Sequence, residues 1–589
     1  MKQFFKFTFA SMLGFILSSV LVFLIFLGII VGIASSSKDE VVVVKDKSIL
    51  HLTLDKQITD KAPSNPLANF DFINMTSKQG SGLYDILKAL NNAKTDKQIA
   101  GVYLDISSIP AGIATVEEIR NALLDFKTSG KFLVSYSEMY DQKTYYLATA
   151  CDKIYLNPQG ALDFRGLSAD IMFFKGALDK LGIEPQILRH GKFKSAVEPF
   201  ILDKMSDANR EQTKTYLTSI WNHIVKGIST TRKISEAELM AIADSMLIRN
   251  PSAALKYKMV DELLYKDQLV EKLMAKVAAK SADDINYITL AKYLKTPAMD
   301  KASKSKDHIA VIFATGDIVS GKTDESKIGS ESLSESIRKA ANDDKVKAIV
   351  LRVNSPGGSA LASDVIWREI ILAKAKKPVV ASMGDVAASG GYYISCAANK
   401  IIASPNTITG SIGVFGLMFN AQKLITEKIG VTYDNVKTNE YADLGGIHRP
   451  FRPQERAIMQ QGVEDVYDTF ISRVAEGRKI TKAQVDSIGQ GRVWTGIDAK
   501  RIGLVDDFGG LEKAITVAAE LAKLKEYKIE QYPKDEEAFE RIFKMISGDV
   551  ESSIITKYFG DEVKYYEGIM WMKEADGIQA RMPFVVDIY

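Results

Sequence analysis

One long segment near the N-terminus carries no charged residue, and this sets it apart from the rest of the chain. From Phe7 to Ala34 the residues are apolar except for a few Thr, Ser and Gly. As a helix this segment would extend about 42 Å at 1.5 Å per residue, which exceeds the ~30 Å hydrocarbon core of a bilayer. A cleaved secretory signal usually has an apolar region of only ~7–15 residues. The segment therefore predicts a transmembrane helix, with a cleaved signal as the alternative.

The charges beside this segment predict its orientation. Lys2 and Lys6 precede it, whereas Lys38 follows together with Asp39 and Glu40. Lysines beside a membrane helix favour the cytoplasmic side. We expect a single-pass protein with a short cytoplasmic N-terminus and the remaining chain on the other side of the membrane. In a Gram-negative cell, this describes an inner-membrane protein that faces the periplasm.

The rest of the chain alternates short apolar runs with segments of helical periodicity. Val350–Asn354 and Pro378–Met383 have the pattern of buried strands, and Asp364–Ala375 and Gly391–Ala398 have that of helices. Ser363 is placed to cap the first of these helices. Alternating strands and helices predict an α/β fold whose strands are largely parallel.

This alternating pattern occurs twice. Gly101–Ser107 corresponds to Ala348–Asn354 at an offset of 247 residues. Further pairs at the same offset are Tyr145 and Tyr392, Lys153 and Lys400, Pro158 and Pro405, and Gly166 and Gly413. The first strands of the two copies, Ile49–Leu52 and His308–Val311, agree only at a different offset. The period is far too long for a solenoid, so it predicts a duplicated domain.

The repeat divides the chain into four parts with a connector. We expect an N-terminus, anchor and stalk over 1–46, a first domain over 47–298, a second domain over 307–530 and an extension over 531–589. Asp300–Asp307, rich in Lys, Ser and Asp, is the expected connector. The extension reads as an acidic helix and an aromatic tail that packs on a domain or touches a membrane; its aromatic residues are Tyr558, Tyr565, Tyr566 and Trp571.

Length and composition agree with a globular protein of at least two domains. The chain has 589 residues, of which 46% are hydrophobic and 25% charged, and a single core typically stops growing near ~250–300 residues. A net charge of +3 gives no reason to expect a nucleic-acid partner. Cys151 and Cys396 lie in apolar contexts, so we expect two buried thiols rather than a disulfide.

A glycine pair follows one strand of the second copy. The segment Asn354–Ser359 contains Gly357 and Gly358, and the matching segment of the first copy, Ser107–Gly112, has lost the pair. Adjacent glycines let backbone N–H groups turn toward a ligand oxygen. A simple strand-to-helix turn is the alternative interpretation.

A serine lies about thirty residues further on, at an expected helix start. Ser389 precedes Gly390, whose N–H could act with that of Gly357 or Gly358 as an oxyanion hole. The positive end of the helix favours developing negative charge there. Ser389 could instead be only a helix cap. The first copy has Gln142, which is not a nucleophile, at the matching position.

A nucleophilic serine needs a base. None of the five histidines lies in a motif with an evident acidic partner, although His448 stays an alternative base. The first copy offers Lys192 and Lys194, whereas the loosely aligned segment of the second copy has no lysine opposite Lys194. A free lysine has a pKa of about 10.4 and must be buried to act as a neutral base. These residues alone do not distinguish Lys192 from Lys194, but they suggest one site shared between the copies.

Together these motifs closely resemble the signal peptide peptidase family, also called protease IV, in its long two-domain form. The resemblance covers nearly the whole chain, and it is carried by Lys194–Phe200, Asn354–Ser359, Ala388–Tyr392 and Gly410–Gly416. The Pro-Gly-Gly element alone would also fit the wider Clp-protease/crotonase superfamily. The resemblance implies two tandem Clp-protease-like α/β domains after the membrane helix, in a bowl-shaped homo-oligomer, with a tetramer expected.

The same resemblance implies the roles of the site residues. Ser389 would be the nucleophile, Lys194 the general base and Ser411 a hydrogen-bond partner of that lysine. We therefore expect a serine peptidase, without metal or cofactor, that degrades hydrophobic peptides such as cleaved signal peptides through an acyl-enzyme. The alternatives are a crotonase-like enzyme acting on acyl thioesters and a membrane scaffold without activity. The cleavage preference, and whether Ser389 and Lys194 meet within one chain, stay open.

Overall fold

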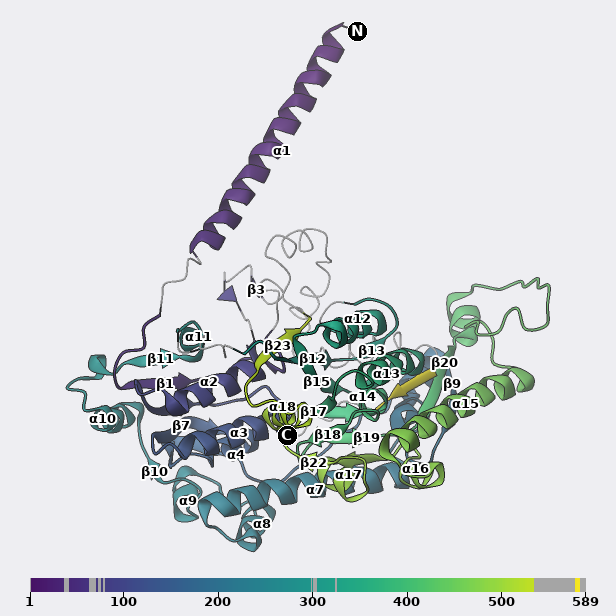
Figure 1. Ribbon diagram of the computed structural model, residues 1–589. Coiled ribbons are helices and arrows are strands. Elements are labelled where there is room, and N and C mark those ends of the chain that lie inside the picture. The colour runs from purple at the N-terminus through teal and green to yellow at the C-terminus, as the bar shows by residue number, and fades with distance from the viewer. Residues whose placement is uncertain are drawn as a thin grey trace.

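The computed structural model describes residues 2–36, 42–62, 70–71, 76–77, 80–297, 299, 305–323, 326–533 and 578–582. Two α/β halves form the body of the molecule, and helix α1 (Lys2–Ser36) stands apart from them (Figure 1). This helix covers the uncharged segment. In the part of the chain that can be described, no helix is both long and apolar enough to cross a membrane. The membrane anchor stays a prediction.

The first half is built on a six-stranded parallel sheet. Its order is β10 (Glu262–Leu263), β8 (Lys153–Leu162), β7 (Phe132–Tyr140), β6 (Ile99–Asp105), β1 (Ser48–Leu52) and β11 (Tyr287–Thr289). Successive side chains of a strand point to opposite faces. Val102 and Leu104 therefore join the core under helices α2 and α3, whereas Tyr103 between them joins the core under α10.

The second half repeats this strand order. Its sheet runs β22 (Asp507–Phe508), β18 (Lys400–Ala403), β17 (Val379–Ala388), β15 (Val346–Ser355), β12 (His308–Thr315) and β23 (Lys528–Tyr532), all parallel. β19 (Ile408–Gly410) and β21 (Val493–Thr495) branch from β17. Helices α3 (Ile113–Lys127) and α13 (Ala360–Lys374) correspond at the offset of 247 residues. Equal strand order is what a duplicated domain predicts, and the tandem α/β fold is confirmed.

A third sheet joins the two halves. Its order is β14 (Ile328–Gly329), β13 (Ile318–Val319), β16 (Gly357–Ser359), β24 (Ile578–Arg581), β20 (Val414–Asn420) and β9 (Glu184–His190). β9 comes from the first half and pairs antiparallel with β20 of the second over seven residues. Because Lys194 follows β9 directly, this pairing brings it toward the second half. Two small sheets complete the set, β2 (Ile58–Thr59) with β5 (Ser81–Gly82) and β3 (Phe70–Asp71) with β4 (Thr76–Ser77).

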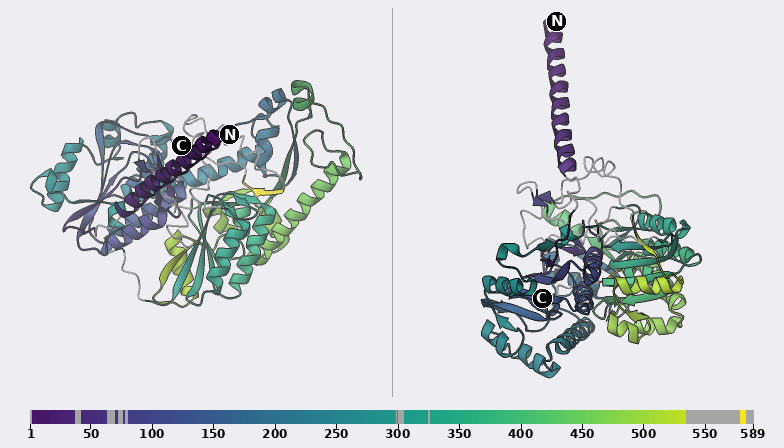
Figure 2. Two further views of the ribbon diagram at one scale, coloured as in Figure 1. Left: turned by 90° about the horizontal axis from the view of Figure 1, so that it is seen from above. Right: turned by 60° about the vertical axis from the view of Figure 1, so that its left-hand side comes forward.

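Helices pack around the two large sheets and the third sheet (Figure 2). In the first half they are α2 (Leu83–Thr95), α3, α4 (Gln142–Ala148), α5 (Lys175–Leu181), α6 (Glu198–Ile201), α7 (Asp207–Arg232), α8 (Glu236–Asp244), α9 (Pro251–Lys256), α10 (Lys266–Val277) and α11 (Leu290–Tyr293). In the second half they are α12 (Ser330–Asn342), α13, α14 (Gly390–Ser395), α15 (Pro453–Arg478), α16 (Lys482–Ile488), α17 (Gly496–Arg501) and α18 (Leu511–Leu521). Short 3₁₀ turns lie at Ser195–Val197 and Ala282–Asp284, and a π-helical turn at Leu424–Ile429.

A buried ion cluster lies between the halves. Arg352 of β15 has no exposed surface, and its guanidinium donates to Asp60 at 2.7 Å and to Glu118 at 2.6 Å. Nearby, Asp385 of the second half accepts two hydrogen bonds from Thr115, the second residue after the start of α3. These charge-assisted bonds fix the register between the two halves at the level of the β15 and β17 strand ends.

Some local expectations need correction. The cap of α13 is Ser359, whose hydroxyl accepts from the amide of Ala362 at 3.3 Å, and Ser363 lies inside the helix instead. The predicted helix at 391–398 is shorter and begins at Gly390. Cys151 and Cys396 are free and buried, as expected. Most of the predicted connector, and the acidic and aromatic parts of the extension, lie outside the described residues. The domain boundaries stay a prediction.

Candidate active site

Ser389 lies at the sharp turn between strand β17 and helix α14. Its φ of 55° is in the left-handed region, which is uncommon for a residue other than glycine and is often found at functional sites. The amide of Ser389 donates to the carbonyl of Gly410 at 2.8 Å, which fixes this turn against β19. Its hydroxyl makes no capping hydrogen bond to the helix. The interpretation of Ser389 as a mere helix cap is therefore wrong.

Lys194 reaches this serine from the other half of the chain. It lies just after β9, at the start of the turn Ser195–Val197, and its side chain has no exposed surface. The Lys194 Nζ is 2.8 Å from the Ser389 Oγ. It is also 3.1 Å from both the carbonyl oxygen and the Oγ of Ser411. The structure thus brings together three predicted site residues within one chain, with Lys194 separated by 195 residues from Ser389 and by 217 from Ser411.

The surroundings of Lys194 favour its neutral form. Burial lowers the pKa of the Lys194 amine well below its usual range, because the charged form loses its hydration. Its hydrogen-bond partners are hydroxyl and carbonyl oxygens, and none of the ion pairs among the described residues includes it. Lys192 is exposed, with its amine over the ring of Phe193 at 5.3 Å. Burial alone is the cause of the lowered Lys194 pKa, and Lys192 does not contribute to it.

A glutamine that the sequence analysis missed holds the backbone around Lys194. Gln212 of α7 is 1% exposed. Its amide nitrogen donates to the Phe193 carbonyl at 3.1 Å and to the Ser195 hydroxyl at 2.9 Å, and its amide oxygen accepts from the Val493 N–H at 3.2 Å. Gln212 therefore ties the lysine turn to strand β21 of the second half. The only sequence signal was a polar residue on the buried face of an amphipathic helix.

The three predicted oxyanion glycines lie next to the serine but differ in their bonds. Gly357 and Gly358 have φ values of 103° and 154°, which only glycine adopts readily. The Gly357 N–H donates to the Ser355 hydroxyl at 3.1 Å. A β-carbon added to Gly357 would lie 2.7 Å from the amide nitrogen of Gly390, so the two backbones are in close approach. A β-carbon added to Gly358 would collide with the backbone of Ile318 in β13, so both positions need glycine.

The matching position of the first half carries different contacts. Gln142 is the first residue of α4, whereas Ser389 immediately precedes α14, and the Gln142 amide nitrogen donates to the Gly166 carbonyl at 2.8 Å. The Ser389 hydroxyl lies 3.4 Å from the carbonyl of Gly413, the repeat counterpart of Gly166. In the first half this position therefore ties a loop in place.

The histidines differ from expectation, although none contacts Ser389 through a hydrogen bond. Four of the five pair with carboxylates, namely His51 with Asp105, His190 with Glu464, His223 with Glu117 and His308 with Glu530. These partners are at least 54 residues away in the sequence, so no local motif shows them. The fifth, His448, packs against the ring of Tyr433 at 5.0 Å.

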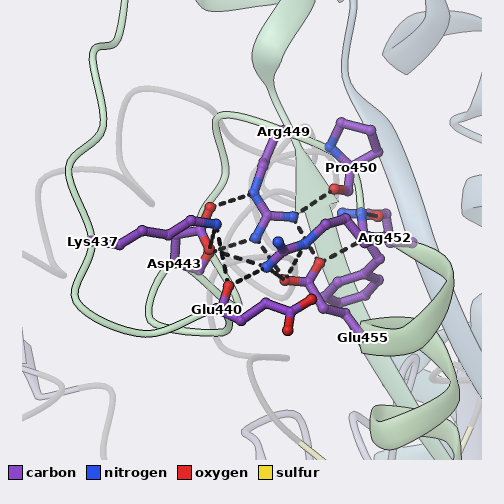
Figure 3. Close-up of polar contacts among 9 residues, drawn as sticks. Lys437, Glu440, Asp443, Arg449, Pro450, Arg452 and Glu455 are labelled. Carbon is purple, nitrogen blue, oxygen red and sulfur yellow. Dashed lines mark hydrogen bonds and ion pairs between the residues drawn. The ribbon is translucent and has the colours of Figure 1, made fainter.

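His448 belongs to a loop with its own ionic framework. Arg449 donates to Asp443 at 2.8 Å and to Glu455 at 2.7 Å, and Arg452 contacts the same two carboxylates (Figure 3). The adjacent cavity is lined by residues 435–437, 442–446 and 448, and neither Ser389 nor Lys194 lines it. The contacts of Ser389 therefore favour Lys194 over His448 as its partner.

Comparison with known proteins places this geometry in a class. The sequence pattern of "Peptidase family S49" matches residues 125–280 and 371–525, and that of "Clp protease" matches residues 300–409. Such a chain is a serine peptidase with a Clp-protease-like fold. More particularly, the chain belongs to peptidase family S49. The acyl-thioester and scaffold alternatives are therefore wrong.

Similar proteins span most of the chain. "Protease 4" of Salmonella typhi is 40% identical over 81% of this chain and 78% of its own length. "Protease 4" of Haemophilus influenzae is 38% identical over 74% of this chain and 72% of its own. "Serine protease SPPA, chloroplastic" of Arabidopsis thaliana is 36% identical over 82% of this chain and 70% of its own.

Proposed function

We propose that this peptidase works through a Ser–Lys dyad, with Ser389 as the nucleophile and Lys194 as the general base. The observation that carries the proposal is the 2.8 Å distance between the Lys194 Nζ and the Ser389 Oγ in a fully buried setting. Neutral Lys194 takes the proton of Ser389 as the Oγ attacks a peptide carbonyl. The lysine then gives that proton to the leaving amine, and water hydrolyses the acyl-enzyme in the second half of the cycle.

Ser411 orients the base. A neutral amine has two N–H donors and one lone pair. The Ser411 carbonyl can only accept, so it takes one N–H, and the Ser411 hydroxyl takes the other. The lone pair of Lys194 is then left for the hydroxyl proton of Ser389.

The oxyanion binds to backbone N–H groups at the glycine turn. Gly358 and Gly390 are the stronger candidates, because the Gly357 N–H already donates to Ser355. The start of α14 adds the positive end of a short helix at the same point. Removing one such donor typically costs about 10²–10³ in kcat.

The proposed substrates are hydrophobic peptides such as cleaved signal peptides, and the proposed location is the inner membrane with the catalytic halves in the periplasm. The support is the uncharged segment Phe7–Ala34, its flanking lysines and the family resemblance. A membrane-anchored site would meet peptides that partition into the bilayer. We also propose a homo-oligomer, a tetramer by the same resemblance.

The dyad is tested with a fluorogenic peptide and matched variants. We expect Ser389→Ala and Lys194→Met to lose at least about 10²-fold in kcat. Lys192→Met, two residues from the base and exposed, serves as the control and should keep the wild-type rate. A serine-directed acylating agent should label Ser389 in the wild type but much more slowly in Lys194→Met. Near-normal turnover by Ser389→Ala, with unchanged folding by circular dichroism, would disprove the proposal.

A further inference from the structure

Helix α15 lies beside both parts of the candidate dyad. It packs against β9, the strand that leads to Lys194, and against α14, the helix that follows the candidate nucleophile (Figure 1). The ring of Tyr467 stacks on His190, the last residue of β9, with 3.8 Å between the centroids. One helical turn further on, the ring of Phe470 stacks on Tyr393 of α14 at 4.6 Å. One face of α15 therefore contacts the elements that carry the two reacting groups.

The hydroxyl of Tyr467 binds α16 and the segment that follows it. Tyr467 is only 3% exposed. Its hydroxyl donates to the Asp486 carboxylate at 2.6 Å and accepts the Gln490 N–H at 3.3 Å. Gln490 adopts a left-handed φ of 53°, which is uncommon for a residue other than glycine. The Tyr467 hydroxyl therefore holds an unusual backbone turn against α15.

This turn is part of residues 489–493, which cover Lys194 on one side. The Gln490 carbonyl accepts the Phe193 N–H at 2.9 Å, so it fixes the residue before the lysine. Gly491 is buried, and a β-carbon added to it would lie 2.6 Å from both the backbone nitrogen and the Cβ of Lys194. Its neighbours Gln490 and Arg492 are half-buried. Residues 489–493 therefore lie between the lysine stem and solvent.

The same residues contact the partner that orients the lysine amine. The Arg492 carbonyl accepts the Ser411 N–H at 2.7 Å. A β-carbon on Gly413 would lie 2.6 Å from the Cα of Gly491 and 3.2 Å from the Cδ of Lys194. The lysine stem and the two glycines are thus in close contact, and no space is left for a side chain between them.

The charged side chains around these residues have partners other than the lysine amine. These contacts are His190 with Glu464, Arg492 with Glu211, Asp486 with Tyr467, Glu198 with Ser206, and the Lys192 amine over the Phe193 ring. The hydrogen-bond partners of Lys194 are uncharged oxygens of Ser389 and Ser411. The exclusion of water, rather than a neighbouring charge, therefore keeps the lysine neutral.

We propose that Tyr467 is a positioning residue of the dyad, because its hydroxyl holds residues 489–493 over Lys194 and so keeps water from the lysine amine. This inference rests on the proposed function. Without the hydroxyl, the Gln490 N–H loses its acceptor and residues 489–493 open more often. Water then hydrates the charged form of Lys194, so the amine is neutral only at a higher pH. Tyr467 acts on the base through Gln490 and does not contact the reacting atoms.

Tyr467→Phe tests this role, because it keeps the ring that stacks on His190 and removes only the hydroxyl. The measurement is kcat/KM for a fluorogenic peptide from pH 5 to pH 10, with the full-length protein in detergent. We expect the acid limb to move up by about one pH unit, which lowers kcat/KM about tenfold on that limb. At pH 10 the rate should recover to within about threefold of the wild type, with KM unchanged. An unmoved acid limb, with full activity or with an equal loss at every pH, would overturn the proposal.

Tyr145→Phe is the matched control. Tyr145 has no exposed surface, and its hydroxyl donates to the Met259 carbonyl at 2.8 Å within the first half. This variant also loses one buried hydroxyl bond, but it should keep the wild-type acid limb. Hydrogen–deuterium exchange provides a readout that is independent of activity. Residues 488–493 should exchange faster than in the wild type in Tyr467→Phe alone, and unchanged exchange there would contradict the proposal.

Lys194→Met in the same series separates this inference from the proposed function. If Lys194→Met kept the wild-type rate, the dyad and the role of Tyr467 would both be wrong. If Lys194→Met is inactive but Tyr467→Phe has the acid limb of the wild type, the dyad stands and only the positioning role of Tyr467 is overturned.

Discussion

Lys194 and Ser411 are joined by two hydrogen bonds, each 3.1 Å long, from the lysine Nζ to the carbonyl and the hydroxyl oxygens of the serine. Ser411 adopts a left-handed φ of 48°, and its amide donates to the Arg492 carbonyl at 2.7 Å. The strained backbone turns both oxygens toward the amine. In the proposed mechanism, Ser411 therefore sets the direction of the lysine lone pair.

This arrangement predicts the effect of Ser411→Ala. The variant keeps the carbonyl contact to Lys194 but loses the hydroxyl, so the amine can rotate away from Ser389. We expect kcat to fall about 10- to 100-fold with little change in KM, less than the loss in Lys194→Met. Steady-state kinetics on a fluorogenic peptide measure both constants. A rise in KM at constant kcat would instead assign Ser411 to substrate binding.

The buried lysine also predicts the pH dependence of activity. Only the neutral amine accepts the proton of Ser389, and burial lowers the Lys194 pKa well below its usual range. Activity should therefore be lost as the pH falls through this lowered pKa and should be full above it. The measurement is kcat/KM from pH 5 to pH 10. His448→Gln serves as the control: its acid limb should coincide with that of the wild type, whereas a shifted limb would favour histidine as the base.

The same pKa shift predicts a change in stability. At any pH between the folded and unfolded pKa values of Lys194, the unfolded chain binds one more proton, so stability increases with pH in that range. Lys194→Met removes this penalty, which amounts to about 1.4 kcal/mol for each unit of pKa difference. The melting temperature of Lys194→Met should exceed that of the wild type at pH 6, and the gap should close as the pH approaches about 10.4.

The control for this measurement is Lys192→Met. Lys192 is exposed, so its replacement should leave the melting temperature within about 1 °C of the wild type at both pH values. A Lys194→Met protein that is no more stable than the wild type at pH 6 would show that the amine is not penalised by burial.

Much of the architecture could be predicted because each strand and helix has a local hydrophobic pattern, and this pattern occurs in both copies. The strands at Val350 and Val379 are short apolar runs, and copies at one offset imply one strand order. The serine and the glycines stand out because they are intact in one copy and lost in the other. The partners of these residues depend on long-range packing instead. Gln212 and Lys194 gain their roles only when β9 pairs with β20.

Other features were beyond sequence reasoning for similar reasons. Lys192 and Lys194 are the same residue type, two positions apart. Which of them is buried depends on the conformation of the turn after β9. Strand β24 has only four residues, and it takes its place in the third sheet by pairing with β16 and β20, which are far away in the sequence. Arg352 of the second copy corresponds to Asp105 of the first. The sequence alone gave this difference no evident meaning, because Arg352 pairs with residues of the other half.

Arg352 provides a test of how the halves are held together. Its guanidinium is fully buried against Asp60 and Glu118, so Arg352→Met leaves two carboxylates without their cation. Removing one partner of a buried ion pair typically costs about 3–5 kcal/mol.

The matched control is Lys94→Met, because the Lys94–Asp125 pair is exposed and such pairs contribute about 1 kcal/mol or less. Urea denaturation in detergent measures both variants. If the ion cluster sets the register of the halves, Arg352→Met should also lower kcat, because Lys194 and Ser389 belong to different halves. A variant destabilised no more than Lys94→Met would mean that apolar packing alone holds the two halves in register.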